Sequence, residues 1–181
     1  MNSSYVIKTD RLGLRNWDEQ DLDAFSDLNA DPTVMRYFPE TLTKDQTLAA
    51  INRMQKHYEN YGFCYFATDV LSTNEFIGFI GLHHQNYEAP FTPCVDIGWR
   101  LKKSAWGKGY ATEGAKQCLK FGFEKIGLEE IYAIASEINT PSIRVMQKIG
   151  MEKAVEFDHP VLLNNDRLRK CLAYKAVNSP I

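Results

Sequence analysis

Three consecutive runs of aromatic and branched residues in the middle of the chain do most to constrain its fold. They cover residues 63–70, 76–83 and 94–101, and turn-forming residues separate them. Runs of this composition and spacing are typical of neighbouring antiparallel strands. The chain has 181 residues, of which 44% are hydrophobic and 24% charged, and this is enough for one well-filled core. We therefore expect a single domain over residues 1–181 that is built on an antiparallel sheet.

Helix signals lie on both sides of these strands. A cap at residues 16–19 begins the first helix and Asp31-Pro32 ends it, while the second begins at Thr43 with a capping-box pattern and stops at Gly62. Two further helices are expected at residues 111–126 and 139–149, and four further strands at residues 6–14, 131–135, 151–157 and 168–177. The sequence thus predicts an α/β fold, of the α+β kind, with four helices and a mixed, mostly antiparallel sheet of about seven strands.

Charge and cysteine content exclude several classes of partner. The 21 Lys and Arg residues against 23 Asp and Glu give a net charge of −2, which provides no electrostatic attraction for nucleic acid or for an anionic membrane. The four cysteines are widely spaced, so we expect free thiols in a reducing, cytoplasmic setting and no metal site. The longest strongly apolar run, residues 76–82, is far shorter than the ~20 residues that a membrane helix needs.

The strongest chemical signal is the segment at residues 106–112, which reads Trp-Gly-Lys-Gly-Tyr-Ala-Thr. It leads from a strand-like region directly into a helix. Glycines allow a turn whose N–H groups point into one concavity, and a helix start adds unpaired donors and partial positive charge, which suits a pyrophosphate. The same residues would also serve as a plain tight turn. They form neither a Walker loop nor the complete Gly-x-Gly-x-x-Gly pattern.

This segment resembles the pyrophosphate loop of the GNAT superfamily of N-acetyltransferases, which follows Gln/Arg-x-x-Gly-x-Gly/Ala. Trp106 stands where the family has Gln or Arg, a form that is frequent in the branch of ribosomal-protein N-terminal acetyltransferases. Three more segments are similar to that branch, in the same order: Thr9-Asp10-Arg11-Leu12-Gly13-Leu14-Arg15, Asp96-Ile97-Gly98-Trp99-Arg100-Leu101, and residues 139–151. The resemblance spans residues 9 to about 175.

The resemblance implies a sheet that is splayed open at its centre and that admits acetyl-coenzyme A (acetyl-CoA) as cosubstrate. The pantetheine arm is expected along the strand edge that ends at Leu101, and the pyrophosphate on the N–H groups of the glycine turn. The expected cofactor-binding residues are Trp99, Arg100, Leu101, Gly107, Lys108, Gly109, Tyr110, Ala111, Thr112, Asn139 and Ser142. The implied reaction is direct attack of a primary amine on the thioester, without a covalent enzyme intermediate.

Catalytic roles follow from the same resemblance. Such a reaction needs a base for the ammonium proton and an acid for the departing thiolate. Asp96 lies where many family members have a carboxylate base that acts directly or through water, and a merely orienting role for Asp96 stays open. Many members have a Tyr acid at the position of Met146, which cannot donate a proton. Ser142 is therefore the expected acid.

The acceptor site is expected under the loop between the first two helices, as in the family. Tyr37, Phe38 and Trp99 are the expected substrate-binding residues, and core packing is an equal interpretation for Trp99. The expected acceptor is a protein N-terminus or a small-molecule amine, and the expected assembly is a monomer or a homodimer.

Two other functions stay open at this point. Because Met146 and Asp96 depart from the family pattern, one alternative is an acyl-CoA-binding sensor of the same fold that acetylates nothing. ATP binding at the glycine turn is a weaker alternative, since no Walker or kinase-type residues accompany it. His83 and His84 are expected to point to opposite faces of a strand and to bind no metal.

Overall fold

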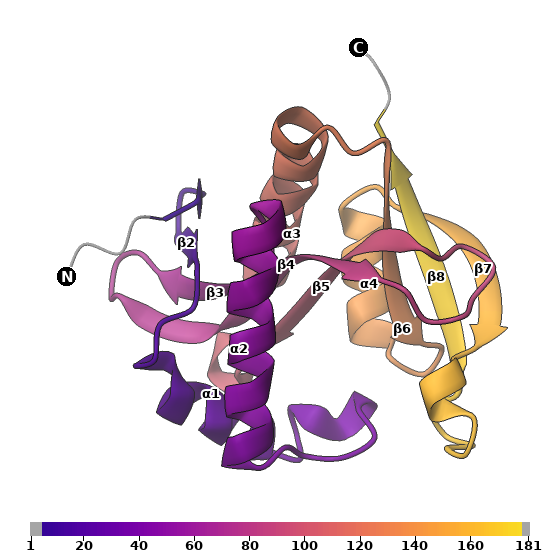
Figure 1. Ribbon diagram of the computed structural model, residues 1–181, viewed down its shortest axis with the longest axis horizontal. Helices are drawn as coiled ribbons and strands as arrows, with labels where there is room; N and C mark the ends of the chain where they lie inside the picture. The colour runs from indigo at the N-terminus through magenta and orange to yellow at the C-terminus, as the bar shows by residue number, and fades with distance from the viewer. Residues whose placement is uncertain (1–4, 179–181) are drawn as a thin grey trace.

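A computed structural model describes residues 5–178 of the chain (Figure 1). The helices are α1 (Asp21–Ala30), α2 (Lys44–Tyr61), α3 (Tyr110–Phe121) and α4 (Thr140–Lys148), with short 3₁₀ turns η1 (Met35–Tyr37), η2 (Lys103–Ala105) and η4 (Pro160–Leu162) and a π-helical turn η3 (Gly122–Ile126). The strands are β1 (Ile7–Lys8), β2 (Leu12–Arg15), β3 (Tyr65–Val70), β4 (Glu75–Gln85), β5 (Cys94–Leu101), β6 (Glu130–Ser136), β7 (Glu152–Asp158) and β8 (Lys170–Val177). All four predicted helices are present.

In the described part of the chain, eight strands form one sheet in the order β1-β2-β3-β4-β5-β6-β8-β7. Neighbouring strands are antiparallel except β5 and β6, which are parallel. The predicted mixed, mostly antiparallel sheet is therefore confirmed. It has eight strands rather than about seven, because residues 6–14 form a hairpin instead of one strand. Thr9 closes its turn: the Thr9 N–H donates to the Leu12 carbonyl at 2.9 Å, and the Thr9 hydroxyl oxygen accepts the Leu12 N–H at 2.9 Å.

Strands β5 and β6 meet over a very short stretch. Asp96 and Tyr132 are the one register pair between these two described strands, whereas β4 and β5 are paired over the whole of Cys94–Leu101. Beyond Asp96 the two parallel strands diverge, so the β5 edge from Ile97 to Leu101 faces no strand. The predicted opening at the centre of the sheet is thus present, and we call it the central opening.

Helices cover both faces of the sheet. On the face of α1 and α2, the rings of Phe25 and Phe79 pack with centroids 6.2 Å apart. On the face of α3 and α4, Gly114 permits a close approach, since a Cβ on it would lie 2.5 Å from Cδ1 of Ile80. Figure 1 shows α2 in front of the central strands and α3 behind them. Because side chains of a strand alternate between faces, residues of β5 divide between these two helical layers.

The ends of α2 and α4 follow local sequence rules. Thr43 and Gln46 form the predicted capping box at the start of α2, and Gly62 ends this helix with a left-handed φ of 75°. Asn139 caps α4, because its Oδ1 accepts the N–H of Ser142 at 3.3 Å. No helix within residues 5–178 combines the length and the apolar character needed to cross a membrane.

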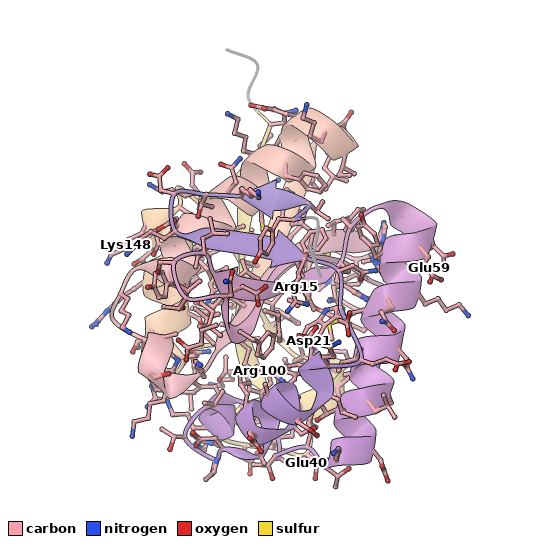
Figure 2. The ribbon with its side chains drawn as sticks, turned by 90° about the vertical axis from the view of Figure 1, so that its left-hand side faces the viewer. Arg15, Asp21, Glu40, Glu59, Arg100 and Lys148 are labelled. Carbon is pink, nitrogen blue, oxygen red and sulfur yellow. The ribbon has the colours of Figure 1, made fainter. Side chains whose placement is uncertain are left out.

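A buried ion network joins α1 to the sheet. Arg15, the last residue of β2, donates to Asp21 of α1 at 2.7 and 2.8 Å and to Asp69 of β3 at 2.7 Å. The hydrogen bond with Asp21 is the main reason why the pKa of Arg15 is raised. Asp21 also accepts the N–H of Asp18, which fixes the start of α1. Arg15 and Asp21 are labelled in Figure 2.

The loop between β4 and β5, residues 86–93, extends over the β6–β8–β7 part of the sheet (Figure 1). Phe91 stacks on Tyr132 with ring centroids 5.0 Å apart, and it meets Phe157 edge-on, also at 5.0 Å. Tyr87 packs on His159 with centroids 4.5 Å apart. This aromatic cluster therefore connects the two parts of the sheet on either side of the central opening.

Candidate functional site

The glycine turn at residues 106–112 follows β5 and η2 and leads into α3. Gly107 and Gly109 have φ angles of 74° and 80°, a left-handed conformation that favours glycine. The indole N–H of Trp106 donates to the carbonyl of Leu101 at 2.8 Å. The side chain that stands in place of the family's Gln or Arg thus ties the turn to the end of β5. Sequence reasoning misses this tether, because an indole donor has no preferred partner along the chain.

The start of α3 presents unpaired backbone donors. Its N-cap residue is Gly109, which has no side chain to satisfy them. The N–H of Glu113 donates to the carbonyl of Gly109 at 3.0 Å, and the N–H groups of residues 110–112, which precede it, have no partner within the helix. A Cβ placed on Gly107 would meet no described atom within 4 Å. The turn is therefore an open cradle of backbone donors at a helix start, which suits a phosphate.

Glu113, in the first turn of α3, fixes the glycine turn to the β1–β2 hairpin. Its carboxylate accepts hydrogen bonds from the Thr9 hydroxyl at 2.5 Å and from Arg11 Nε at 2.7 Å. Arg11 Nη1 also donates to the carbonyl of Lys108 at 3.0 Å. Burial acts to raise the pKa of Glu113, but the hydrogen bonds from Thr9 and Arg11 outweigh it and lower that pKa. The negative charge of Glu113 is thus offset by Arg11 beside the open cradle.

The central opening is bordered by polar groups without hydrogen-bond partners in the described part of the chain, and such groups suit a ligand that contains several amide groups. On the side of β6, the peptide groups of β5 from Ile97 to Leu101 have no strand partner. Ser136, the last residue of β6, has a buried hydroxyl with no hydrogen-bond partner among the described residues. Together with the cradle at residues 106–112, these groups fit a ligand that combines amides with a pyrophosphate, as coenzyme A does.

Asp96 lies where β5 and β6 separate, and only 8% of its surface is exposed. Burial raises the pKa of its carboxyl group to about 6. The hydroxyl of Tyr65 donates to Oδ1 of Asp96 at 2.6 Å, and Nε2 of Gln85 donates to the Tyr65 hydroxyl oxygen at 3.1 Å. The central opening thus begins at a carboxyl group that exchanges a proton near neutral pH.

Glycines explain how Tyr65 of β3 reaches across β4 to β5. Tyr65 pairs with Gly81, and Gly81 pairs with Gly98, so the ring lies along two positions without side chains. A Cβ on Gly98 would lie 3.0 Å from Cε1 of Tyr65. The rings of Phe79 and His83 flank the Tyr65 ring at centroid distances of 5.1 and 5.3 Å. Sequence reasoning misses Tyr65, because only the register of the sheet brings it to Asp96.

The start of α4 brings Asn139 and Ser142 together beside the end of β6. Oδ1 of Asn139 is engaged with the backbone of Ser142, while the half-buried hydroxyl of Ser142 has no hydrogen-bond partner among residues 5–178. Met146 faces the core, with 1% of its surface exposed. Of these three residues, Ser142 therefore retains a free hydroxyl near the central opening.

The predicted acceptor-site residues divide between the two faces of the sheet. Tyr37 ends η1, and Phe38 follows it with its ring centroid 4.0 Å from the guanidinium carbon of Arg100. Arg100 and Asp96 lie on the same face of β5, that of α1 and α2. Trp99 points to the opposite face, where it packs against the core. The structure thus brings Phe38 to the face of Asp96 and places Trp99 on the other.

Three of the chain's four histidines gather where the end of α2 meets β4. Nε2 of His57 lies 3.0 Å from Nδ1 of His84, and the rings of His57 and His83 stack with centroids 4.0 Å apart. The expected alternation of His83 and His84 is thus wrong, since the ring of His84 turns toward Tyr61, 4.4 Å away. Burial lowers the pKa of all three, to about 4 for His57. Within residues 5–178 no group of three or more His, Cys, Asp or Glu side chains is arranged to hold a metal ion.

A mixed sheet that opens beside a glycine-bearing helix start defines an acetyltransferase fold. The sequence pattern of the Acetyltransferase (GNAT) domain matches residues 11–152, and the chain belongs to this family. The protein YkkB of Bacillus subtilis strain 168 is 34% identical to it over 152 residues, which cover 83% of this chain and 87% of YkkB. The resemblance stated from the motifs is therefore confirmed.

Solved structures share the fold. A GNAT-family acetyltransferase from Bacillus anthracis has a TM-score of 0.80 and 29% identity, over 94% of this chain and 97% of that one. RimL, a ribosomal-protein α-N-acetyltransferase whose structure holds coenzyme A, has a TM-score of 0.77 over 96% of this chain and 98% of its own. Because the identity with RimL is 16%, this second likeness concerns the fold alone.

Proposed function

We propose that the protein transfers the acetyl group of acetyl-CoA to a primary amine, by direct attack of the amine in a ternary complex. The acceptor is a protein N-terminus or a small-molecule amine. The observation that carries this proposal is the place of Asp96, which is buried at the start of the central opening and held there by Tyr65. A base at this point faces any thioester that fills the opening.

Asp96 takes the proton that the attacking amine loses. Its pKa of about 6 makes it a stronger base than an ordinary aspartate and leaves it mostly ionised at pH 7. The α-amino group of a peptide has a pKa of about 7.7–8.0, so proton transfer to Asp96, directly or through water, costs roughly 2–3 kcal/mol. The C–N bond forms as the C–S bond breaks, and no covalent bond to the protein is needed.

Backbone groups hold the cosubstrate in this proposal. The N–H groups of residues 107–112 bind the pyrophosphate with the help of the partial positive charge at the start of α3, and Lys108 adds a full charge. The free edge of β5 at residues 99–101 pairs with the pantetheine amides. Asn139 and Ser142 contact the cosubstrate beyond its phosphates. The open cradle and the unpaired strand edge support these assignments.

Ser142 gives a proton to the departing thiolate. Its hydroxyl is free of described partners and lies at the start of α4, next to the end of β6 that borders the opening. Met146, at the position of the family Tyr, is buried in the core and has no proton to donate.

Two measurements test the proposal. Calorimetric titration of the purified protein with acetyl-CoA tests binding, and thiol release with N-terminal peptides, polyamines, aminoglycosides and amino acids tests transfer. We expect saturable binding and thiol release with one class of amine. Binding without release across the panel would overturn the transferase assignment and favour the acyl-CoA-binding sensor.

The variant Gly109→Glu tests the cradle itself. Its side chain would obstruct and repel the pyrophosphate, so we expect the Kd for acetyl-CoA to rise by at least tenfold. The matched control is Gly127→Glu, because Gly127 has nearly the same φ, 79°, and lies at the end of η3 away from the cradle. Both variants carry the same backbone strain. Equal affinity of the two variants for acetyl-CoA would overturn the pyrophosphate assignment.

A further inference from the structure

Arg100 is a half-buried cation without an anionic partner among residues 5–178. Its Nη1 donates to Oδ1 of Asn29, a neutral side chain, at 2.6 Å. Its Nε is fully buried and has no hydrogen-bond partner among those residues. Nη2 also lacks a described partner but, unlike Nε, is not shielded from solvent. The guanidinium therefore keeps unsatisfied donors, and those on Nη2 are open to a ligand.

Arg15 shows how the same chain treats a buried guanidinium that serves structure alone. Arg15 is bonded to the carboxylates of Asp21 and Asp69, and its pKa is raised. No described carboxylate contacts Arg100, and burial lowers its pKa to about 10. Because a buried charge is normally paired, the surroundings of Arg100 lack an anion that those of Arg15 have.

Two aromatic rings lie close to the guanidinium of Arg100. Its central carbon lies 4.0 Å from the ring centroid of Phe38 and 5.4 Å from that of Phe79. These two rings supply no hydrogen-bond acceptor, so the N–H groups of Arg100 are the place for a further partner. A planar edge with two parallel donors matches a carboxylate, which it binds with two hydrogen bonds.

Arg100 lies on the same face of β5 as Asp96, four residues further toward the glycine turn. A strand rises about 3.3 Å per residue, so the two Cα atoms are about 13 Å apart. The ring of Tyr65 lies between them, over Gly98. A ligand that reaches both groups therefore has its amine and its anionic group several bonds apart.

We propose that the acceptor is a small amine that carries a carboxylate, and that Arg100 binds this carboxylate while the amine lies near Asp96. The inference rests on the proposed acetyl transfer, and it narrows the acceptor from amines in general to amino acids with separated functional groups. The side chain of Arg100 has this role, whereas its backbone belongs to the β5 edge assigned to the cosubstrate. Arg100 is labelled in Figure 2.

The test compares ω-amino acids with partners that lack only the charge. The series runs from β-alanine through γ-aminobutyrate and δ-aminovalerate to ε-aminocaproate, each beside its neutral amide and the alkylamine of the same length. Thiol release gives kcat/KM for each. We expect the acid to exceed its amide and its alkylamine by at least tenfold, chiefly through a lower KM, and the best acid to be longer than β-alanine.

Substitutions of Arg100 test whether its side chain causes the preference for acids over amides. In Arg100→Met we expect the ratio of kcat/KM for an acid to kcat/KM for its amide to fall close to one. Arg100→Lys keeps the charge without the planar guanidinium, so its ratio should be intermediate. Arg53→Met removes the same charge from an exposed site on α2 and should leave the ratio unchanged. Since the ratio compares two acceptors within one variant, partial unfolding does not change it.

Each kinetic outcome decides between the two proposals. Transfer to the amides as fast as to the acids would overturn the carboxylate inference and leave the acetyltransferase proposal standing. A raised KM for acetyl-CoA in Arg100→Met, with the acid preference retained, would assign the side chain to the cosubstrate and also overturn the carboxylate inference.

A direct binding measurement keeps the two proposals separate if acetyl-CoA does not bind. The proposed function then fails, and calorimetry measures the binding of the ω-amino acids to the parent protein and to Arg100→Met without cosubstrate. Binding that the variant loses would support the carboxylate site. Equal binding to the two proteins, or no binding to either, would overturn it.

Discussion

The hydroxyl of Tyr65 on β3 donates a hydrogen bond to Oδ1 of Asp96 on β5, across a strand that lies between them, at 2.6 Å. This bond favours the ionised form of Asp96, while burial favours the neutral form and raises its pKa to about 6. The two effects together leave a carboxylate that is ionised at pH 7 and still basic. The relationship makes the pH dependence of the reaction a test of the site.

For the parent protein, kcat/KM should fall as the pH is lowered through about 6, because protonated Asp96 cannot accept a proton. In Tyr65→Phe the carboxylate loses a donor, so the pKa of Asp96 rises and the acidic limb of the profile moves to higher pH. Tyr58→Phe removes a hydroxyl from α2 as the matched control. An acidic limb at the same pH in Tyr65→Phe and in the parent would contradict this role of Tyr65.

Trp106→Phe removes the indole donor that holds the glycine turn against Leu101. A hydrogen bond of this kind contributes about 0.5–1.5 kcal/mol, so we expect the Kd for acetyl-CoA to rise up to about tenfold. Trp17→Phe loses a similar bond, from its indole to the Tyr65 carbonyl, on the other face of the sheet. Calorimetry should therefore show weaker binding for Trp106→Phe only. Equal Kd values for these two variants would contradict the tether.

Arg15→Met should destabilise the fold by about 3–5 kcal/mol, because it leaves the carboxylates of Asp21 and Asp69 buried without a cation. Urea unfolding at pH 7 measures the loss. Lys44→Met breaks the exposed pair between Lys44 and Asp23 and should destabilise the fold far less, because exposed ion pairs contribute little. Similar losses in the free energy of unfolding for both variants would show that the buried Arg15 network stabilises the fold no more than an exposed ion pair does.

The histidine cluster predicts a loss of stability in acid. His57 has a pKa of about 4 in the fold, because it is buried, and an ordinary value near 6.5 in the unfolded chain. The unfolded state therefore binds more protons between these values, so the contribution of His57 is complete above pH 6.5 and decreases as the pH falls toward 4. In His57→Gln the free energy of unfolding should fall less steeply over this range. An unchanged slope would contradict the assignment.

Local features of the fold could be read from the sequence because they depend on residues a few positions apart. The capping box joins Thr43 to Gln46, and the cap of α4 joins Asn139 to Ser142, each over three residues. The glycine turn is similar, since its positive φ angles and its helix start are set within a few residues. For this reason the cradle was predictable from residues 106–112 alone.

Contacts between distant residues could not be predicted in the same way. Tyr65 and Asp96 are 31 residues apart, and Arg11 and Glu113 are 102 apart, so neither pair follows from local spacing. The single predicted strand at residues 6–14 is wrong for a related reason. Its turn is stabilised partly by Glu113, a residue that no local pattern connects with Thr9.

The single pairing of Asp96 with Tyr132 divides the sheet into a five-stranded and a three-stranded part. In the proposed complex, the pantetheine chain takes the place of the backbone partners that the edge of β5 lacks, so the cosubstrate completes the tertiary structure as well as entering the reaction. A ligand whose free concentration is 100 times its Kd adds about 2.7 kcal/mol to the free energy of unfolding. Supply of acetyl-CoA would then govern how long the folded protein persists as well as how fast it turns over.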